Sequence, residues 1–145
     1  MQIPPVFLVM SLLLMAFLDH AFPLAEVIDR PYRYGGIVIA GLSLALALWA
    51  VAHFRRAGTN IHPHKPALAL VTAGPYRFTR NPMYLAMSGI LLGAAIFLGS
   101  LTPFIVIPAF MAVISERFIE PEEARLEAAF GAPYLEYKSR VRRWL

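Results

Sequence analysis

The chain has 145 residues, a length typical of one domain, and its composition is strongly apolar. Hydrophobic residues make up 59% and charged residues only 15%, whereas soluble globular proteins carry about 25% charged residues. The net charge is +4 and there is no cysteine, which excludes disulfides, cysteine-bound metal and thiol catalysis. We interpret the chain as an all-α integral membrane protein, and its positive charge as a membrane-side effect that does not indicate nucleic-acid binding.

Apolar segments predict a polytopic membrane protein with about four transmembrane helices. Residues 34–54 form an uncharged run of 21 residues, which at 1.5 Å per residue reaches about 31 Å, enough to cross the hydrocarbon core. Residues 83–114 carry no Asp, Glu, Lys, Arg or His, a run too long for one ordinary span. The sequence GSLTP at 99–103 supplies a break within it. We therefore expect spans over about residues 3–22, 34–54, 83–98 and 103–119.

Basic residues predict which side of the membrane each segment faces. Most of them lie in two segments, 55–82 and 120–145. The loop between the first two spans has only Arg30 and Arg33, which nearby acidic residues offset. Because basic residues favour the cytoplasmic side, we expect both termini and both of these segments in the cytoplasm. The chain is then a single membrane domain (1–145) that ends in a cytoplasmic helical cap.

A polar stretch at 72–87, TAGPYRFTRNPMYLAM, interrupts the apolar register just before the third expected span. Its Gly-Pro pair at 74–75 is a turn signal. Asn81 and Pro82 predict the N-cap and first position of a helix, with the asparagine side chain accepting a backbone N–H. A helix N-terminus beside Arg80 also suits an anion such as a carboxylate or phosphate. The residues alone leave both interpretations open.

The tail from residue 115 onward is rich in acidic and aromatic residues. Pro121 is expected to break the chain after the fourth span, because a proline moves the preceding residue out of the α region. A new helix then starts with Glu122 and Glu123 in its first turn, Gly131 ends it, and Pro133 opens another. These acids either complement the helix dipole or pair with a cationic ligand, and the residues alone do not decide between the two.

Taken together, one segment offers groups for an anion and the other offers carboxylates for a cation. Tyrosine rings can add to the cation site: Tyr76, Tyr84, Tyr134 and Tyr137. A zwitterion with a sulfonium and an amino-acid end, such as S-adenosylmethionine, fits both. From the residues alone this is one hypothesis among several.

These residues resemble the isoprenylcysteine carboxyl methyltransferase and phospholipid methyltransferase superfamily of membrane enzymes. One hallmark, G-P-Y-R…R-[HN]-P-x-Y, is matched at 74–77 and 80–84. The second, E-E-x-x-L-x-x-x-F-G-x-x-Y-x-x-Y, is matched over 122–137. The likeness covers about residues 55–145 and implies several membrane helices, a helical hairpin and a cytoplasmic cap. It also implies that S-adenosylmethionine binds between the first motif and the double glutamate.

The resemblance further implies roles for single residues. Those expected to line or engage the cofactor are Gly74, Tyr76, Asn81, Pro82, Tyr84, Glu122 and Glu123. Arg80, Arg117 and Glu123 are the expected catalytic residues. Many members of this superfamily carry histidine at the position of Asn81, and an asparagine side chain cannot titrate, so it cannot carry a proton here.

Methyl transfer to a lipophilic acceptor is the function that these features favour. A carboxylate acceptor needs only a positive group such as Arg80 or Arg117 to hold it. An amine acceptor needs a base, for which Glu116, Glu120 and His53 are candidates.

Two other function classes stay open: a non-catalytic membrane scaffold of the same fold, and an NADPH-dependent enzyme of the sterol-reductase type. Both complete motifs favour the methyltransferase, and the small size of the chain argues against the reductase. His62 and His64 lie two residues apart without a third ligand in sight, so we expect no metal site.

Overall fold

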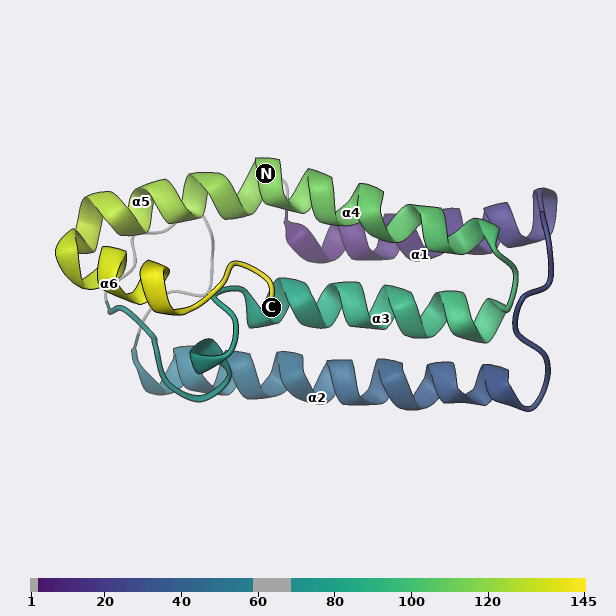
Figure 1. Cartoon of the computed structure of the whole chain (residues 1–145), viewed down its shortest axis with the longest axis horizontal. Helices are drawn as coiled ribbons and strands as arrows, with labels where there is room; N and C mark the ends of the chain where they lie inside the picture. The colour runs from purple at the N-terminus through teal and green to yellow at the C-terminus, as the bar shows by residue number, and fades with distance from the viewer. Residues whose placement is uncertain (1–2, 59–68) are drawn as a thin grey trace.

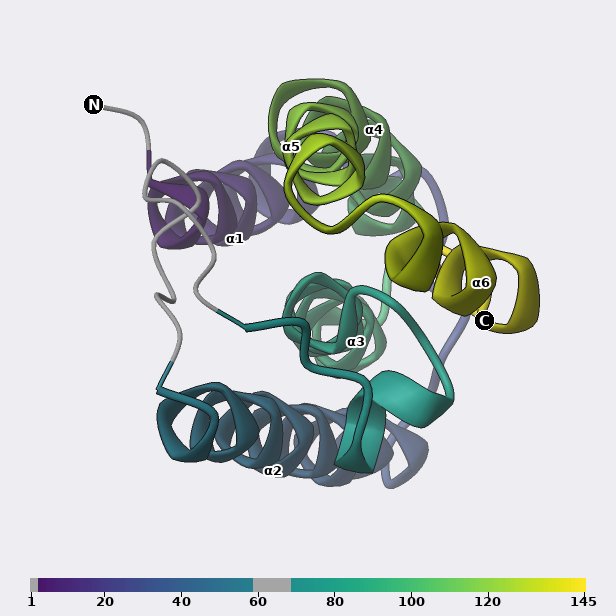
Figure 2. The same cartoon turned by 90° about the vertical axis from the view of Figure 1, so that its left-hand side faces the viewer.

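The computed structural model describes residues 3–58 and 69–145, which are almost entirely helical. The helices are α1 (Pro4–Ala21), α2 (Gly35–Arg56), α3 (Pro82–Leu98), α4 (Val106–Ile114), α5 (Glu120–Phe130) and α6 (Ala132–Arg140). Helices α1 to α4 alternate in direction along one long axis (Figure 1). Figure 2 shows α3 between α2 on one side and α1 and α4 on the other. The expected all-α class is confirmed for this part of the chain.

Three helical segments of the described chain are long and apolar enough to cross a membrane. They are Pro4–Ala21, Tyr32–Arg56 and Thr102–Phe130. Helix α3 is also apolar but has only 17 residues, about 26 Å at 1.5 Å per residue. The structure therefore supports three spanning helices, and a total of four stays a prediction.

The break expected at Pro121 is wrong. Helix α4, a π-helical turn (Ser115–Ile119) and α5 follow one another without interruption, and Figure 1 shows them as one continuous rod. Glu120 keeps helical angles, φ −63° and ψ −45°, and its N–H bonds to Ser115 O, five residues back. This wider turn shifts the hydrogen-bond register just before Pro121, and proline has no backbone N–H to donate. The helix can therefore continue through Pro121. The double glutamate therefore lies on an extension of the fourth apolar segment.

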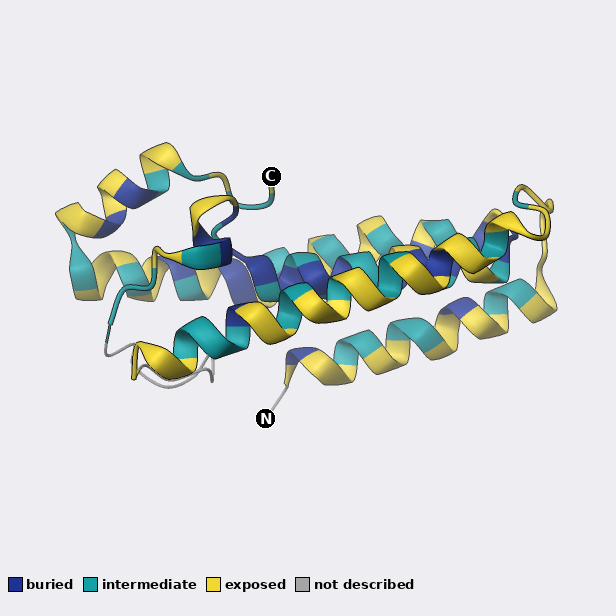
Figure 3. Ribbon diagram, turned by 90° about the horizontal axis from the view of Figure 1, so that it is seen from below, coloured by how far each residue is buried: buried dark blue, intermediate teal, exposed yellow. Residues whose placement is uncertain are grey.

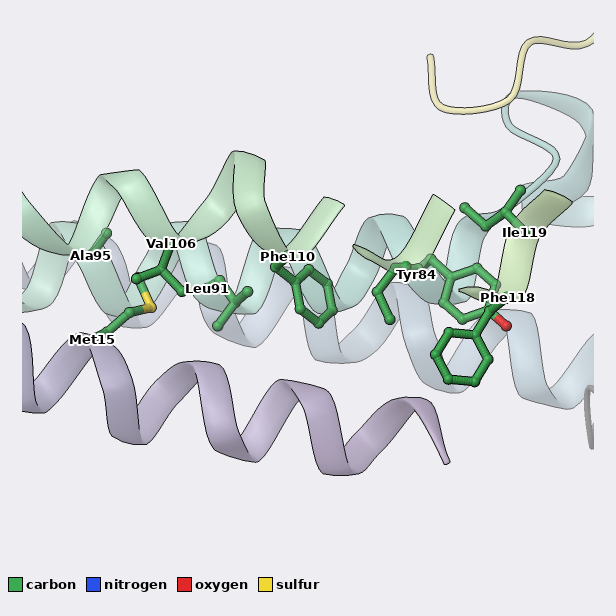
Figure 4. Close-up of a cluster of buried hydrophobic side chains, with 9 residues drawn as sticks. Met15, Tyr84, Leu91, Ala95, Val106, Phe110, Phe118 and Ile119 are labelled. Atoms are coloured by element: carbon green, nitrogen blue, oxygen red, sulfur yellow. The ribbon is translucent and has the colours of Figure 1, made fainter. Parts of the chain in front are cut away.

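Helices α1, α3 and α4 enclose the larger apolar core. Figure 4 shows Met15 of α1 pointing towards Val106 of α4, with Leu91 of α3 next to them and Phe110 further along the core. Tyr84, Phe118 and Ile119 belong to the same cluster and extend it to the start of α3. Burial of these side chains anchors the start of α3, where the first motif ends, to the α4–α5 rod.

Helices α2 and α3 meet through small residues. A Cβ added at Gly93 of α3 would lie 2.5 Å from Gly36 O, and one at Gly89 would lie 2.2 Å from Ser43 Oγ. Such residues let two helix backbones approach closely, as in membrane helix pairs. Outward-facing apolar side chains such as Leu42 and Leu48 stay exposed, and Figure 3 shows this exposed outer surface along α1 and α2. That pattern suits contact with lipid tails.

Candidate active site

The two polar segments of the sequence meet at one end of the helix bundle, where α5, α6 and the start of α3 lie (Figure 1). The short 3-10 helix Gly74–Arg77 and the residues up to Pro82 approach from one side. Helices α5 and α6 approach from the other, connected by a turn at Gly131, whose φ of +58° ends α5 as expected. Side chains from both segments form the site.

Glu123 is the buried centre of an ion-pair cluster. Its carboxylate accepts N–H groups from Arg80 Nη2 at 2.9 Å, Arg143 Nη2 at 2.8 Å and Arg143 Nε at 3.2 Å. The Arg80 and Glu123 side chains are only 10% and 9% exposed. A buried carboxylate is stable only when it is paired and hydrogen-bonded, and these contacts meet that requirement for both oxygens of Glu123.

The two terminal nitrogens of Arg80 are hydrogen-bonded, whereas its Nε is not. Its Nη1 donates to the backbone oxygen of Lys138 at 3.0 Å, in addition to the pair with Glu123. Its Nε is buried and is the one such side-chain nitrogen or oxygen in the described residues without a hydrogen-bond partner. A buried donor left in this way costs about 1–3 kcal/mol, so an acceptor that reached it would be favoured.

Glu122 has different surroundings from its neighbour. It accepts a hydrogen bond from the Tyr84 hydroxyl at 3.3 Å and is half-buried. Burial and the negative charge of Glu122 both raise the pKa of Tyr76, which lies in the 3-10 helix opposite. Glu122 is thus a carboxylate beside two tyrosines, with the charge of Arg125 also acting on it, and the tyrosine rings suit a cationic group.

Asn81 stands at the expected N-cap position but does not cap α3 with its side chain. No side-chain cap bond forms, and its Nδ2 instead donates to the backbone oxygen of Arg143 at 3.0 Å. The expected cap is therefore wrong, because a carbonyl from the tail takes up the side-chain amide. The Asn81 N–H bonds to Thr79 Oγ1 at 3.1 Å, so this one backbone donor is satisfied within the turn before α3.

Gly74 has a positive φ of +62°, and a Cβ there would lie 2.3 Å from Nε2 of His53. Glycine is therefore required for the end of α2 to approach the first motif. Next to it, Tyr76 packs on Phe54 with ring centroids 5.1 Å apart. The Tyr137 hydroxyl donates to Tyr76 O at 2.7 Å, which ties α6 to the same segment.

Residues 32–132 match the phospholipid methyltransferase family. The chain belongs to this family. The chain is also 41% identical over 63 residues to an uncharacterized protein of Haemophilus influenzae, a stretch that covers 43% of this chain and 100% of that protein. No solved structure matches. Family membership indicates methyltransferase activity on a lipid-like substrate and fits an integral membrane protein. It favours neither the scaffold alternative nor the reductase alternative.

The phospholipid methyltransferase match includes the first motif and the double glutamate, but it ends at residue 132 and leaves out the rest of α6 and the tail. Within the matched residues, the structure brings together Arg80 and Glu123, and Tyr84 and Glu122. Arg117 lies on the π-helical turn with an exposed side chain. Its expected catalytic role stays a prediction.

Two features of the site were not found from the sequence. Arg143 is one of several basic residues in the tail, and no spacing sets it apart from Arg140 or Arg142. Thr79 lies inside the first motif, but the motif gives its position no role. His62 and His64 lie outside the described residues, and the described part contains no group of three side chains suited to a metal ion.

Proposed function

We propose that this protein transfers a methyl group from S-adenosylmethionine to a lipophilic acceptor at the membrane surface, on the side that we expect to be cytoplasmic. The observation that carries the proposal is the meeting of the first motif with the double glutamate. Tyr84 donates to Glu122 at 3.3 Å and Arg80 pairs with Glu123 at 2.9 Å. Membership of the phospholipid methyltransferase family supports the reaction class.

The residues present suit the two charged ends of this cofactor. Glu122, with the rings of Tyr76 and Tyr84 nearby, offers a carboxylate and aromatic faces to a sulfonium or ammonium group. The unpaired Nε of Arg80 offers a donor to a carboxylate oxygen. The cofactor supplies an electrophilic methyl group, so the protein needs to bind, orient and exclude water.

The two adjacent glutamates then have separate tasks. Glu123 already accepts three N–H groups from Arg80 and Arg143, so it is an organising residue that holds Arg80 in place. Glu122 accepts a hydrogen bond from the Tyr84 hydroxyl and is the one that we assign to the ligand. Gly74, Asn81 and Pro82 act by setting the path of the backbone around this point.

The acceptor is expected to enter from the bilayer, since the helices that support the site are apolar on their outer faces. For an amine acceptor, His53 is the candidate base best supported by geometry. Its Nδ1 lies 3.1 Å from Trp49 O, so a proton on Nδ1 satisfies that carbonyl and leaves Nε2 as the basic nitrogen towards Gly74. Glu120, by contrast, is exposed and pairs with Arg143 at 3.3 Å.

Calorimetry of S-adenosylmethionine and S-adenosylhomocysteine with detergent-purified protein tests the proposal. We expect binding in the micromolar range that Glu122→Gln weakens by at least tenfold, about 1.4 kcal/mol, because the charge facing the cation is lost. Glu136→Gln is the matched control, since Glu136 pairs with Arg140 on the surface and its side chain is 70% exposed. A folded wild-type protein that binds neither compound would refute the proposal and favour a scaffold.

A further inference from the structure

The last residues of the chain, 141–145, form a strap that runs back from α6 to the start of α3. Figure 1 shows this strap in yellow, ending beside the first turn of α3. It lies beyond the residues that match the phospholipid methyltransferase family, which end at 132. What it does must therefore be argued from its own contacts.

The strap's backbone is bonded to the segment that leads into α3. The N–H of Arg80 donates to Arg142 O at 2.9 Å. Arg143 O accepts from Thr79 Oγ1 at 3.1 Å and from Asn81 Nδ2 at 3.0 Å. Three successive motif residues thus direct donors at the strap, and the orientation of the Asn81 amide depends on it.

The strap's side chains reach Glu123, Glu120 and the core. Arg143 donates to both carboxylate oxygens of Glu123, at 2.8 and 3.2 Å, and also pairs with Glu120 at 3.3 Å. These hydrogen bonds, above all those to Glu123, raise the pKa of Arg143. Trp144, the next residue, is half-buried and packs against the larger apolar core. The strap is therefore fixed at three kinds of contact: backbone, ion pair and apolar packing.

We propose that Arg143 is a positioning residue of the cofactor site, a role that rests on the function proposed above. By holding the Glu123 carboxylate from the tail side, it directs that group at Arg80 and keeps Arg80 where its free Nε can meet a ligand. Without Arg143, Glu123 keeps one arginine, and the carboxylate is free to turn towards the position assigned to the cationic end. Arg143 thus acts on the ligand through Glu123 and Arg80.

The contrast with Arg140 separates this role from that of an ordinary tail arginine. Arg140 pairs with Glu136 within α6 at 3.4 Å, and both side chains are about seven-tenths exposed. Exposed pairs of this kind contribute little to stability. The carboxylate that Arg143 holds is 9% exposed, so the loss of its partner leaves a buried charge with fewer hydrogen bonds.

Two readouts test the proposal on the full chain. The chain has two tryptophans, so Trp49→Phe leaves Trp144 as a fluorescent reporter of the strap. In that background we expect Arg143→Ala to shift Trp144 emission to the red and to weaken S-adenosylmethionine binding by about tenfold, as loss of a side chain that orients a ligand group does. Arg140→Ala is the matched control and should change neither. Arg143→Lys, which keeps the charge but not the paired contact, should retain an intermediate affinity.

A double-mutant cycle then shows whether Arg143 acts through Glu123. If it does, Arg143→Ala changes the affinity of a Glu123→Gln protein much less than that of the wild type. Equal losses in both backgrounds, or a released strap with unchanged affinity, would overturn the positioning role. If Arg143→Ala left the Trp144 emission unchanged, Arg143 would not be what holds the strap in place. A wild type that binds no cofactor while its strap is docked would refute the proposed function and with it this role, leaving the ion-paired strap established.

Discussion

Replacement of Gly93 by alanine is expected to destabilise the protein by separating α2 from α3. The added Cβ would lie 2.5 Å from Gly36 O, 2.8 Å from Ala40 N and 2.9 Å from Ala40 Cβ. Two of these three atoms belong to the backbone of α2, so no rotation of a side chain relieves the contact. Each distance is below an ordinary van der Waals separation, so the helices must move apart, at a cost of about 1–3 kcal/mol for overpacking.

The matched control for this prediction is Gly41→Ala on α2. A Cβ at Gly41 meets nothing within 4 Å, and alanine in place of glycine favours a helix by about 0.5–1 kcal/mol. Thermal unfolding in one detergent should therefore place Gly93→Ala several degrees below the wild type and Gly41→Ala at or above it. If Gly93→Ala were as stable as the wild type, α2 and α3 could not approach as closely as inferred. Since α2 also carries His53 against Gly74, cofactor affinity should fall with the Gly93 substitution.

Two further predictions concern the tyrosines of α6. Tyr137→Phe leaves the buried Tyr76 O without its 2.7 Å partner, so we expect a loss of about 1–3 kcal/mol in detergent unfolding, and an unchanged stability would refute the bond. Burial, with the charge of Glu123, raises the pKa of Tyr134 to about 12, whereas an unfolded tyrosine titrates near 10. The folded state then keeps a proton that the unfolded state loses, so this contribution is complete below about pH 10 and is lost as the pH rises through about 12. Unfolding measured across that window should show a smaller alkaline loss for Tyr134→Phe than for the wild type.

Apolar runs and chain breaks predicted where α1, α2 and α3 lie. The break at 99–103 is confirmed by Gly99, which ends α3 with a φ of +88°, and the end of α5 at Gly131 is confirmed in the same way. These signals succeed because they act locally: a positive φ favours glycine whatever surrounds it. The same reasoning failed at Pro121, where the local rule on the preceding residue was overridden by a π-helical turn inside a packed rod.

Contacts distant in sequence account for the failures at the site. Asparagine is a preferred N-cap residue, which is why the sequence predicted a side-chain cap at Asn81. Whether its side chain caps α3 or donates to Arg143 O depends on a tail that lies 62 residues away. Arg143 itself has no distinguishing spacing among the basic residues of the tail. Tertiary contacts of this kind carry no periodic signal, so a single sequence does not reveal them.

The double glutamate illustrates where motif reasoning and helix geometry differ. The resemblance assigns both acids to the polar end of one cofactor, as if adjacent residues shared a task. Successive residues on an α-helix lie about 100° apart around its axis, so Glu122 and Glu123 necessarily face different neighbours. The structure gives Glu123 two arginines and Glu122 a tyrosine hydroxyl. The helical period thus explains why the two acids have different partners, and this difference is the basis for our proposal that Glu123 organises the site and Glu122 meets a ligand.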